Sequence, residues 1–226
     1  ASAPVVAWPE LIGPRQARRE RSRRASCHHI RLIARQNGRM SVTELHDLFA
    51  YLALVALGGV VVMVAARVIP SVAGVRFLDA IYRVQLPLAA LVATTATLGS
   101  LWFSEHGNWV PCRYCWFQRI FMYSAAVVLI VASLRRDRGA KWYVVPLASI
   151  GILLSTWHIL LEHGVVEDSK VCEATTPCAN PWYVSIGSMD PNTMQPAEWY
   201  GITLAVMAFC GFAAILALLL IPEHLD

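Results

Sequence analysis

The chain has 226 residues, of which 57% are hydrophobic and only 15% are charged, and its net charge is +4. Because roughly a quarter of the residues in a typical soluble domain are charged, this composition argues against an ordinary soluble protein. The apolar residues are gathered into blocks that are typical of membrane spans. Buried helices of a soluble protein are the alternative, but such runs would rarely recur five times.

The N-terminal tail, residues 1–47, is expected to be disordered. Its first 39 residues carry nine arginines and two glutamates, and the ordinary interpretation is a basic cytoplasmic segment. A second hypothesis is that translation starts at Met40 and that residues 1–39 are a spurious upstream extension. The remaining tail, Met40–Asp47, would then be short and acidic and would cross the membrane easily.

Five apolar segments follow the tail. The first, residues 48–69, is predicted to be an extra transmembrane helix ahead of a four-helix domain that covers residues 84–221. The third segment must begin near Cys115 and admit Arg119 if it is to cross about 30 Å of hydrocarbon. Backbone groups in a membrane bond within their own segment, so each span is predicted to be a helix. The sequence therefore predicts an all-α integral membrane protein, with a four-helix transmembrane bundle plus one extra N-terminal transmembrane helix. The predicted spans are Leu48–Ala66, Val84–Ser104, Cys115–Leu134, Trp142–Leu161 and Trp199–Ile221.

The charges between the spans predict how the chain crosses the membrane. Arg135–Lys141 holds four basic residues and one aspartate, and residues 67–83 hold three arginines and one aspartate. By the positive-inside rule, both segments are cytoplasmic. The loops 105–118 and 162–198, which carry cysteines, then lie on the extracytoplasmic face, where disulfides persist. With five spans this orientation puts the N-terminus outside, and that conflict motivates the hypothesis about residues 1–39.

Four of the six cysteines form two pairs in the outer loops. The first, Cys112-Arg-Tyr-Cys115, has a spacing shared by redox dithiols and zinc sites. Pro111 precedes it and a helix is expected to begin there, so the helix dipole should lower the pKa of a cysteine at that position. Arg119 follows Cys115 at i+4 on the same helix face, where its charge can stabilise a thiolate and polarise a carbonyl oxygen. An arginine that only snorkels to the interface is the alternative.

The second pair, Cys172 and Cys178, lies in a loop of about 37 residues, and loops of that length are often functional. A pair in this position can meet a soluble partner and also reach the membrane surface. Two alternatives stay open. One is a structural disulfide within the loop, and the other is a zinc site made by all four thiols, although a reduced four-thiolate site does not suit an oxidising face. Cys27 lies in the tail, and Cys210 is a small apolar residue within a span.

Several motifs together carry a resemblance to a known family. They are Gly99-Ser-Leu-Trp-Phe-Ser-Glu105, Pro111-Cys-Arg-Tyr-Cys-Trp-Phe-Gln-Arg-Ile-Phe-Met-Tyr123, Trp157-His158-Ile-Leu-Leu-Glu162, Pro177-Cys178 and Trp199-Tyr-Gly201. In these residues the chain resembles the family of disulfide bond formation protein B, especially its Gram-positive-type branch. The resemblance covers residues 87–221, which is four of the five spans.

The resemblance implies a multi-pass protein of the bacterial cell membrane that contacts lipid and binds no nucleic acid and no metal. Its activity would be that of a protein dithiol:quinone oxidoreductase, which reoxidises an extracytoplasmic thioredoxin-fold, DsbA-like partner. Electrons would pass from the loop pair to the Cys-x-x-Cys pair and then to ubiquinone or menaquinone. For His158, a hydrogen bond within the bundle is an equal alternative to a position near the quinone. The implied catalytic residues are Cys112, Cys115, Cys172 and Cys178, and the implied quinone-binding residues are Arg119, His158 and Gln118.

The extra span at residues 48–69 departs from the four-helix family. Quinone-linked reductases of the vitamin K epoxide type have five spans, so a thiol oxidase of that type is one alternative. In that type the quinone-proximal Cys-x-x-Cys follows the loop cysteines, whereas here it precedes them, which favours the first family. About ten additional residues between Cys178 and Trp199 leave the position of the second pair open. A structural membrane protein with two static disulfides is the remaining alternative, and transport has little support because only Arg119 places a charge within a span.

Overall fold

The computed structural model describes residues 42–69, 71–106, 110–166, 183–185 and 201–221. The chain divides into two compact units, Ala1–Glu44 and Leu45–Asp226. Apart from the first three residues of the first described helix, every described element belongs to the second unit. The predicted tail up to residue 41, both hypotheses about residues 1–39, and the pair Cys172 and Cys178 lie outside the described residues.

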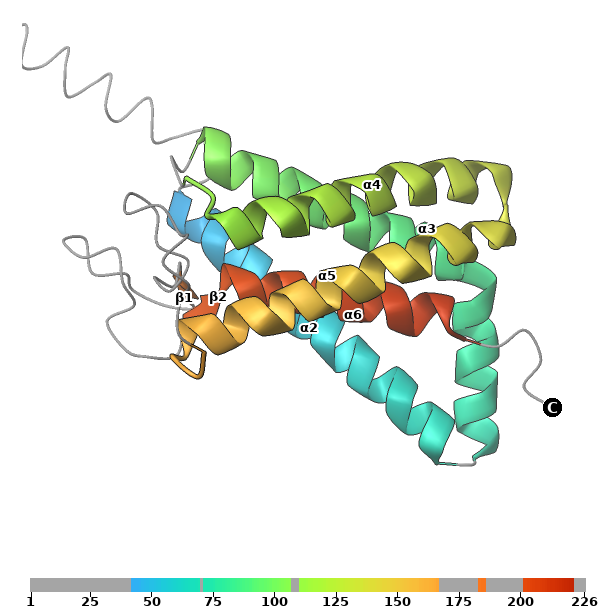
Figure 1. Ribbon diagram of the computed structural model, residues 1–226. Coiled ribbons are helices and arrows are strands. Elements are labelled where there is room, and N and C mark those ends of the chain that lie inside the picture. The colour runs from blue at the N-terminus through green and yellow to red at the C-terminus, as the bar shows by residue number, and fades with distance from the viewer. Residues whose placement is uncertain (1–41, 70, 107–109, 167–182, 186–200, 222–226) are drawn as a thin grey trace, which may run out of the picture. The chain divides into compact units, whose positions relative to one another are not determined.

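Helices make up nearly all of the described chain, as predicted for an all-α membrane protein. Four of them are long and apolar enough to cross a membrane, and a fifth apolar helix is shorter. Helices α3 to α6 run beside one another (Figure 1), whereas α2 contacts them through fewer residues. The elements are α2 (Val42–Val68), α3 (Val72–Glu105), α4 (Arg113–Arg135), the 3-10 helix η2 (Arg138–Ala140), α5 (Lys141–Glu162), β1 (Tyr183–Ser185), β2 (Gly201–Thr203) and α6 (Leu204–Leu219).

Helix α3 begins twelve residues before the predicted start of its span, so most of the stretch 67–83 is helix and not the predicted loop, whereas its cytoplasmic placement stays a prediction. Ser71 caps the helix, since its hydroxyl accepts a hydrogen bond of 3.1 Å from Gly74 N. More than two turns further on, Arg83 forms an exposed i,i+4 ion pair with Asp79. These local interactions continue the helix through a charged stretch that hydropathy alone excludes from a span. Its 34 residues correspond to about 51 Å measured along the helix axis, but Figure 1 shows the first part of α3 at an angle to the part that runs with the bundle.

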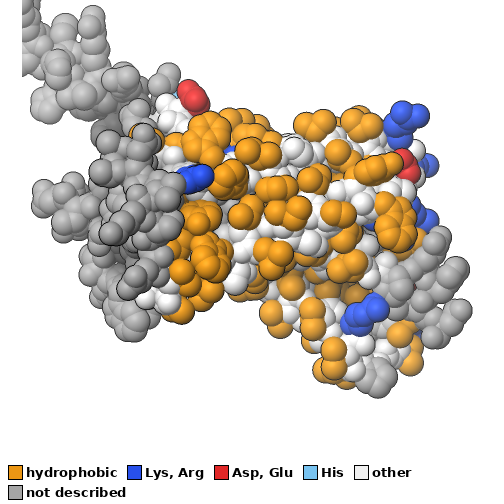
Figure 2. Space-filling view, in the orientation of Figure 1, with side chains coloured by type: hydrophobic (Ala, Val, Ile, Leu, Met, Phe, Trp, Pro, Cys, Tyr) orange, Lys and Arg blue, Asp and Glu red, His pale blue; other side chains and the backbone are white. Residues whose placement is uncertain are grey.

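The basic residues gather at one end of the bundle. Helix α4 ends at Arg135, Arg136 adopts the left-handed conformation, and η2 leads directly into α5. The guanidinium of Arg138 lies 4.5 Å from the centroid of the Tyr82 ring on α3, so the two predicted basic segments meet at this end. Figure 2 shows the lysine and arginine side chains, in blue, mainly at this end, and hydrophobic side chains over the length of the helices. This is the charge distribution that the positive-inside rule predicts for a cytoplasmic end.

Helix α6 is shorter than its predicted span of Trp199–Ile221. It starts at Leu204, because Gly201–Thr203 instead forms strand β2, which pairs antiparallel with β1 in the register Tyr183↔Thr203. The Thr203 hydroxyl caps α6 by accepting from Val206 N at 3.2 Å. The sequence did not predict this two-stranded sheet, which pairs a segment within the long loop with the residues just before α6.

The core of the bundle lies between α3, α4, α5 and α6. Leu129, Val144, Phe212 and Ile215 are fully buried there. The Phe212 ring sits directly against Gly151, where any Cβ would collide with it, so glycine allows α5 and α6 to approach closely. Many outward-facing side chains on all the long helices are large, apolar and exposed, as expected where helices contact lipid.

Candidate redox site

The Cys-x-x-Cys pair lies at the start of α4, as predicted. Cys112 is the N-cap residue, and its sulfur accepts a long contact of 3.4 Å from Cys115 N. The Cys112 Sγ–H also donates to Cys115 Sγ across 3.1 Å, so both side chains are reduced thiols in this arrangement. Spacing of i and i+3 on the first helical turn brings the two sulfurs onto one face, close enough to form a disulfide with a small movement.

The pKa of Cys112 departs from the expectation of a helix-dipole effect. Its hydrogen bond to Cys115, and secondly its burial, raise the pKa from its usual value of 9.0 to about 12, although the contact with His158 opposes this shift. The dipole of a helix contributes a few tenths to about one kcal/mol at such a position, which is less than these effects. Cys112 therefore stays protonated near neutral pH, and the prediction of a lowered pKa is wrong for this residue.

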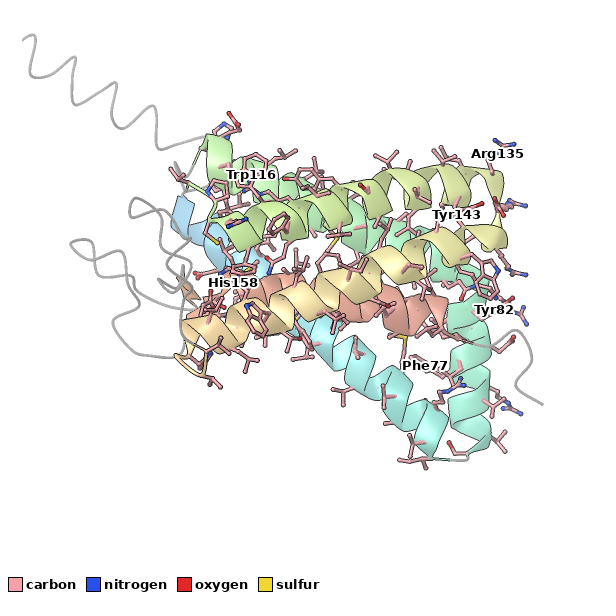
Figure 3. All side chains as sticks on the ribbon, in the orientation of Figure 1. Phe77, Tyr82, Trp116, Arg135, Tyr143 and His158 are labelled. Atoms are coloured by element: carbon pink, nitrogen blue, oxygen red, sulfur yellow. The ribbon has the colours of Figure 1, made fainter. Side chains whose placement is uncertain are left out.

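A buried polar cluster faces Cys112 from α5 and α4. His158 Nε2 lies 3.6 Å from Cys112 Sγ and 3.7 Å from Glu162 Oε1, while His158 Nδ1 lies 3.4 Å from Gln118 Nε2. The side chains of His158 and Glu162 are each only 3% exposed. Figure 3 shows His158 at the end of the bundle that also holds Trp116, away from the basic end marked by Arg135. The acid–base pair formed by His158 and Glu162 therefore lies within reach of Cys112, and Gln118 orients the His158 imidazole.

Arg119 points in a different direction, toward α3. Its Nε donates to Ser100 Oγ at 2.8 Å, and its Nη2 donates to Ser100 O at 3.0 Å and to Ser104 Oγ. The guanidinium also lies 5.4 Å from the centroid of the Trp116 ring. Three hydrogen bonds and one cation–π contact hold the guanidinium at a defined place beside α3, so Arg119 is a positioned residue and not one that only snorkels to the interface.

A cavity of about 510 Å³ opens beside this arginine. It lies between α2, α3, α4 and α6, and its lining is almost entirely apolar. The residues of its lining that carry polar side-chain atoms are Cys115, Gln118, Arg119 and Tyr123 of α4 and Thr95 and Ser100 of α3. Cys112 and His158 do not line it, so the two sulfurs of the pair face different surroundings.

The structure thus brings together five of the seven predicted site residues. It places Cys115, Gln118 and Arg119 at the cavity and His158 beside Cys112, and it does not describe the other two cysteines. Cys112, Cys115 and His158 also offer ligand atoms within 4.8 Å of one another, a spacing that could hold a metal ion, so the expectation of no metal stays a prediction.

Sequence reasoning missed three groups of this site. Glu162 was noted only as part of a motif, and its placement one turn after His158 could have indicated a pair. Ser100 and Ser104 have i,i+4 spacing within an apolar span, which signals a polar partner on that face. Phe49, on the extra helix, carries no local signal of this kind, because only packing brings it to the cavity.

Comparisons with known proteins match most of the bundle to one family. The family described as disulfide bond formation protein DsbB matches residues 82–222. Over 142 residues the chain is 44% identical to a probable disulfide formation protein of Deinococcus radiodurans, covering 62% of this chain and 89% of that protein. It is 36% identical over 129 residues to disulfide bond formation protein C of Bacillus subtilis, covering 56% and 83% of the two chains. No solved structure matches the chain. The match over most of the bundle and the helices that can cross a membrane show that the chain belongs to the DsbB family of disulfide bond formation proteins and is a multi-pass bacterial membrane protein.

Proposed function

We propose that this membrane disulfide-forming protein is a dithiol:quinone oxidoreductase that reoxidises an extracytoplasmic thioredoxin-fold, DsbA-like partner. The observation that carries the proposal is the division of the cysteine pair between two environments. Cys115 lies at the wall of an apolar cavity together with Arg119. Cys112 lies outside that cavity, against His158. One sulfur is therefore placed to serve an apolar acceptor, and the other to exchange with a second dithiol.

The cavity residues fit a quinone of either type, ubiquinone or menaquinone. A volume of about 510 Å³ is in the range of small-molecule sites. Arg119 keeps further N–H capacity beyond its bonds to the serines, so it can donate to a carbonyl oxygen, and the Gln118 amide can donate nearby. A quinone bound there would supply the electron acceptor, since it takes up two electrons and two protons from a dithiol.

The thiol exchange that precedes electron transfer to the quinone uses only protein sulfurs. A partner thiolate attacks the Cys172–Cys178 disulfide, that bond breaks, and a mixed disulfide forms. The second partner thiolate then resolves the mixed disulfide, so the partner leaves oxidised and the loop pair is left as two thiols. The step moves two electrons from the partner to the loop pair.

The reduced loop pair passes these electrons to the first pair. A loop thiolate attacks Cys112 Sγ, the Cys112–Cys115 bond breaks, and Cys115 leaves as a thiolate beside the cavity. The second loop thiolate then releases Cys112, whose sulfur takes a proton. His158 Nε2 at 3.6 Å is placed to deliver that proton, with Glu162 behind it. The protonated Cys112 donating to Cys115, as in the structure, is the arrangement that this step leaves behind.

The alternatives are a quinone-linked thiol oxidase of the vitamin K epoxide reductase type and a structural protein with two static disulfides. The family match favours the DsbB type over the former. A static disulfide needs no positioned arginine and no buried histidine–glutamate pair, so the site geometry supports a catalytic pair over a structural one.

The test uses detergent-purified full-length protein, a reduced thioredoxin-fold partner and a quinone, and follows quinone absorbance during turnover. We expect quinone reduction by the unmodified protein, and none by Cys112→Ser or Cys172→Ser. Cys210→Ser is the matched control and should retain turnover, because Cys210 is buried within α6 and does not line the cavity. Stable disulfides at all four cysteines with no quinone reduction would contradict the proposal.

A further inference from the structure

Helix α2 lies outside the part of the chain that matches the family, yet it forms a wall of the cavity. The family match begins at residue 82, and α2 ends at Val68. Five of its residues line the cavity, namely Phe49, Leu52, Ala53, Val55 and Ala56. The cavity of this protein is therefore built partly by a helix that the matched four-helix region does not include.

The contact that anchors α2 is a close one at the polar end of the cavity. The Phe49 ring lies so near Gly99 that a Cβ on that residue would collide with it. The same ring packs against Phe103 with 5.4 Å between centroids. Gly99 precedes Ser100, one of the partners of Arg119, so α2 is fixed beside the group proposed to bind the quinone ring.

The cavity is longer than a quinone ring requires. Its α3 wall runs from Leu91 to Phe103, thirteen residues whose ends lie about 18 Å apart along a helix. Most of the polar groups lie near Ser100, toward one end of this wall, and apart from Thr95 the remaining length of the wall is apolar. A ring held by Arg119 would leave that apolar length for a hydrocarbon substituent.

Part of the α2 wall is also exposed on the surface of the protein. Leu52 and Val55 line the cavity and are nevertheless 40% and 72% exposed on the surface of the protein. A membrane quinone carries an isoprenoid tail that must reach the hydrocarbon of the bilayer. An opening bordered by exposed apolar side chains provides that route without burying a polar group.

We propose that α2 binds the isoprenoid tail of the quinone through Leu52, Val55 and Ala56, and thereby makes binding depend on the tail. The inference rests on the proposed function, because it assumes that the acceptor is a quinone. It goes further by assigning a specificity-determining role to a helix outside the matched family region.

Photolabelling of the full-length protein tests the placement of the tail directly. A quinone that carries an aryl azide on its tail is bound in detergent, irradiated, and the labelled peptides are identified by mass spectrometry. We expect label on peptides containing residues 49–56 and its loss when an unlabelled tailed quinone is added in excess. Competed label confined to other helices would overturn the inference.

Equilibrium binding, followed by quenching of tryptophan fluorescence, tests the specificity. Ala56→Phe places a larger side chain into the tail region, and it should raise the Kd of a tailed quinone about tenfold. The Kd of the same ring without a tail should change less than about twofold, which also reports that the variant is folded. Ala65→Phe is the matched control, since it makes the same change on α2 beyond the cavity lining, and it should alter neither Kd.

The possible failures are distinguishable. If tailed and tail-less quinones bind the unmodified protein equally well, or if Ala56→Phe and Ala65→Phe behave alike, the role of α2 is wrong and the quinone function stands. If the unmodified protein binds and reduces neither quinone, the proposed function fails, and the inference fails with it.

Discussion

The two sulfurs of the Cys-x-x-Cys pair are 3.1 Å apart but belong to two different regions. On one side, Cys115 faces an apolar cavity whose polar groups include Arg119. On the other side, Cys112 faces a buried histidine and glutamate. Under the proposed function, a single helical turn separates two kinds of chemistry. Electron transfer to an apolar acceptor needs a dry surface and a fixed positive charge, whereas thiol exchange needs a proton donor and acceptor.

Cys115→Ser should have the largest effect on this division. Without the sulfur at the cavity, quinone reduction should fall to background, a loss on the order of a thousandfold or more, because the group that reacts is gone. Cys112 should still form a mixed disulfide with the loop pair, and non-reducing mass spectrometry should detect it. Retained quinone reduction would show that Cys115 is not the sulfur that serves the cavity.

The pKa of Cys112 predicts a large difference in its reactivity with alkylating agents. A pKa of about 12 in place of 9.0 leaves roughly a thousandfold less thiolate at neutral pH. In the reduced protein, the rate of Cys112 alkylation by iodoacetamide should therefore still be rising at pH 10, as followed by mass spectrometry. Cys115→Ala removes the main cause of the raised pKa, so the rate should level off at a lower pH. An unchanged pH profile in that variant would contradict the assigned cause.

Arg119→Met tests the cavity side without removing a sulfur. Loss of a charged donor should lower kcat/KM for quinone by about 10- to 100-fold. Exchange between the loop pair and the partner, measured by stopped-flow fluorescence, should change much less. Arg113→Met is the matched control, because Arg113 is exposed at the start of the same helix and should be neutral in both assays. Equal loss of both activities in Arg119→Met would argue against its place in the quinone site.

Glu162→Gln tests the Cys112 side of the pair and should have the smallest effect. Removing the charge next to His158 should slow electron transfer from the loop pair to Cys112 by about 3- to 10-fold, because general acid–base assistance is weakened. Binding of quinone, measured as a Kd, should not change, since Glu162 does not line the cavity. Glu105→Gln, at an exposed position at the end of α3, provides the control. If Glu162→Gln changed the Kd of quinone but left electron transfer from the loop pair to Cys112 unchanged, Glu162 would belong to the cavity side and not to the Cys112 side.

Much of the bundle could be predicted from local sequence properties. Apolar runs identified all five helices, and Pro111 with the Cys-x-x-Cys spacing identified the start of α4. The errors lie where local interactions compete with hydropathy. Ser71 and the Arg83–Asp79 pair extend α3 through a charged stretch, and the pairing of β2 with β1 shortens α6. The role of the second cysteine pair stays a prediction, since Cys172 and Cys178 lie outside the described residues.

The sequence by itself determined that this is a helical membrane protein with a cysteine pair at a helix start, because hydropathy, proline and close spacing act over a few residues. Which sulfur faces the cavity, which acid stands behind His158, and that α2 completes the cavity wall were decided only by the tertiary structure. The physical reason is that these features join residues from different helices, such as Cys112 with His158 and Gly99 with Phe49. Contacts of that kind depend on how helices pack, which no local pattern specifies.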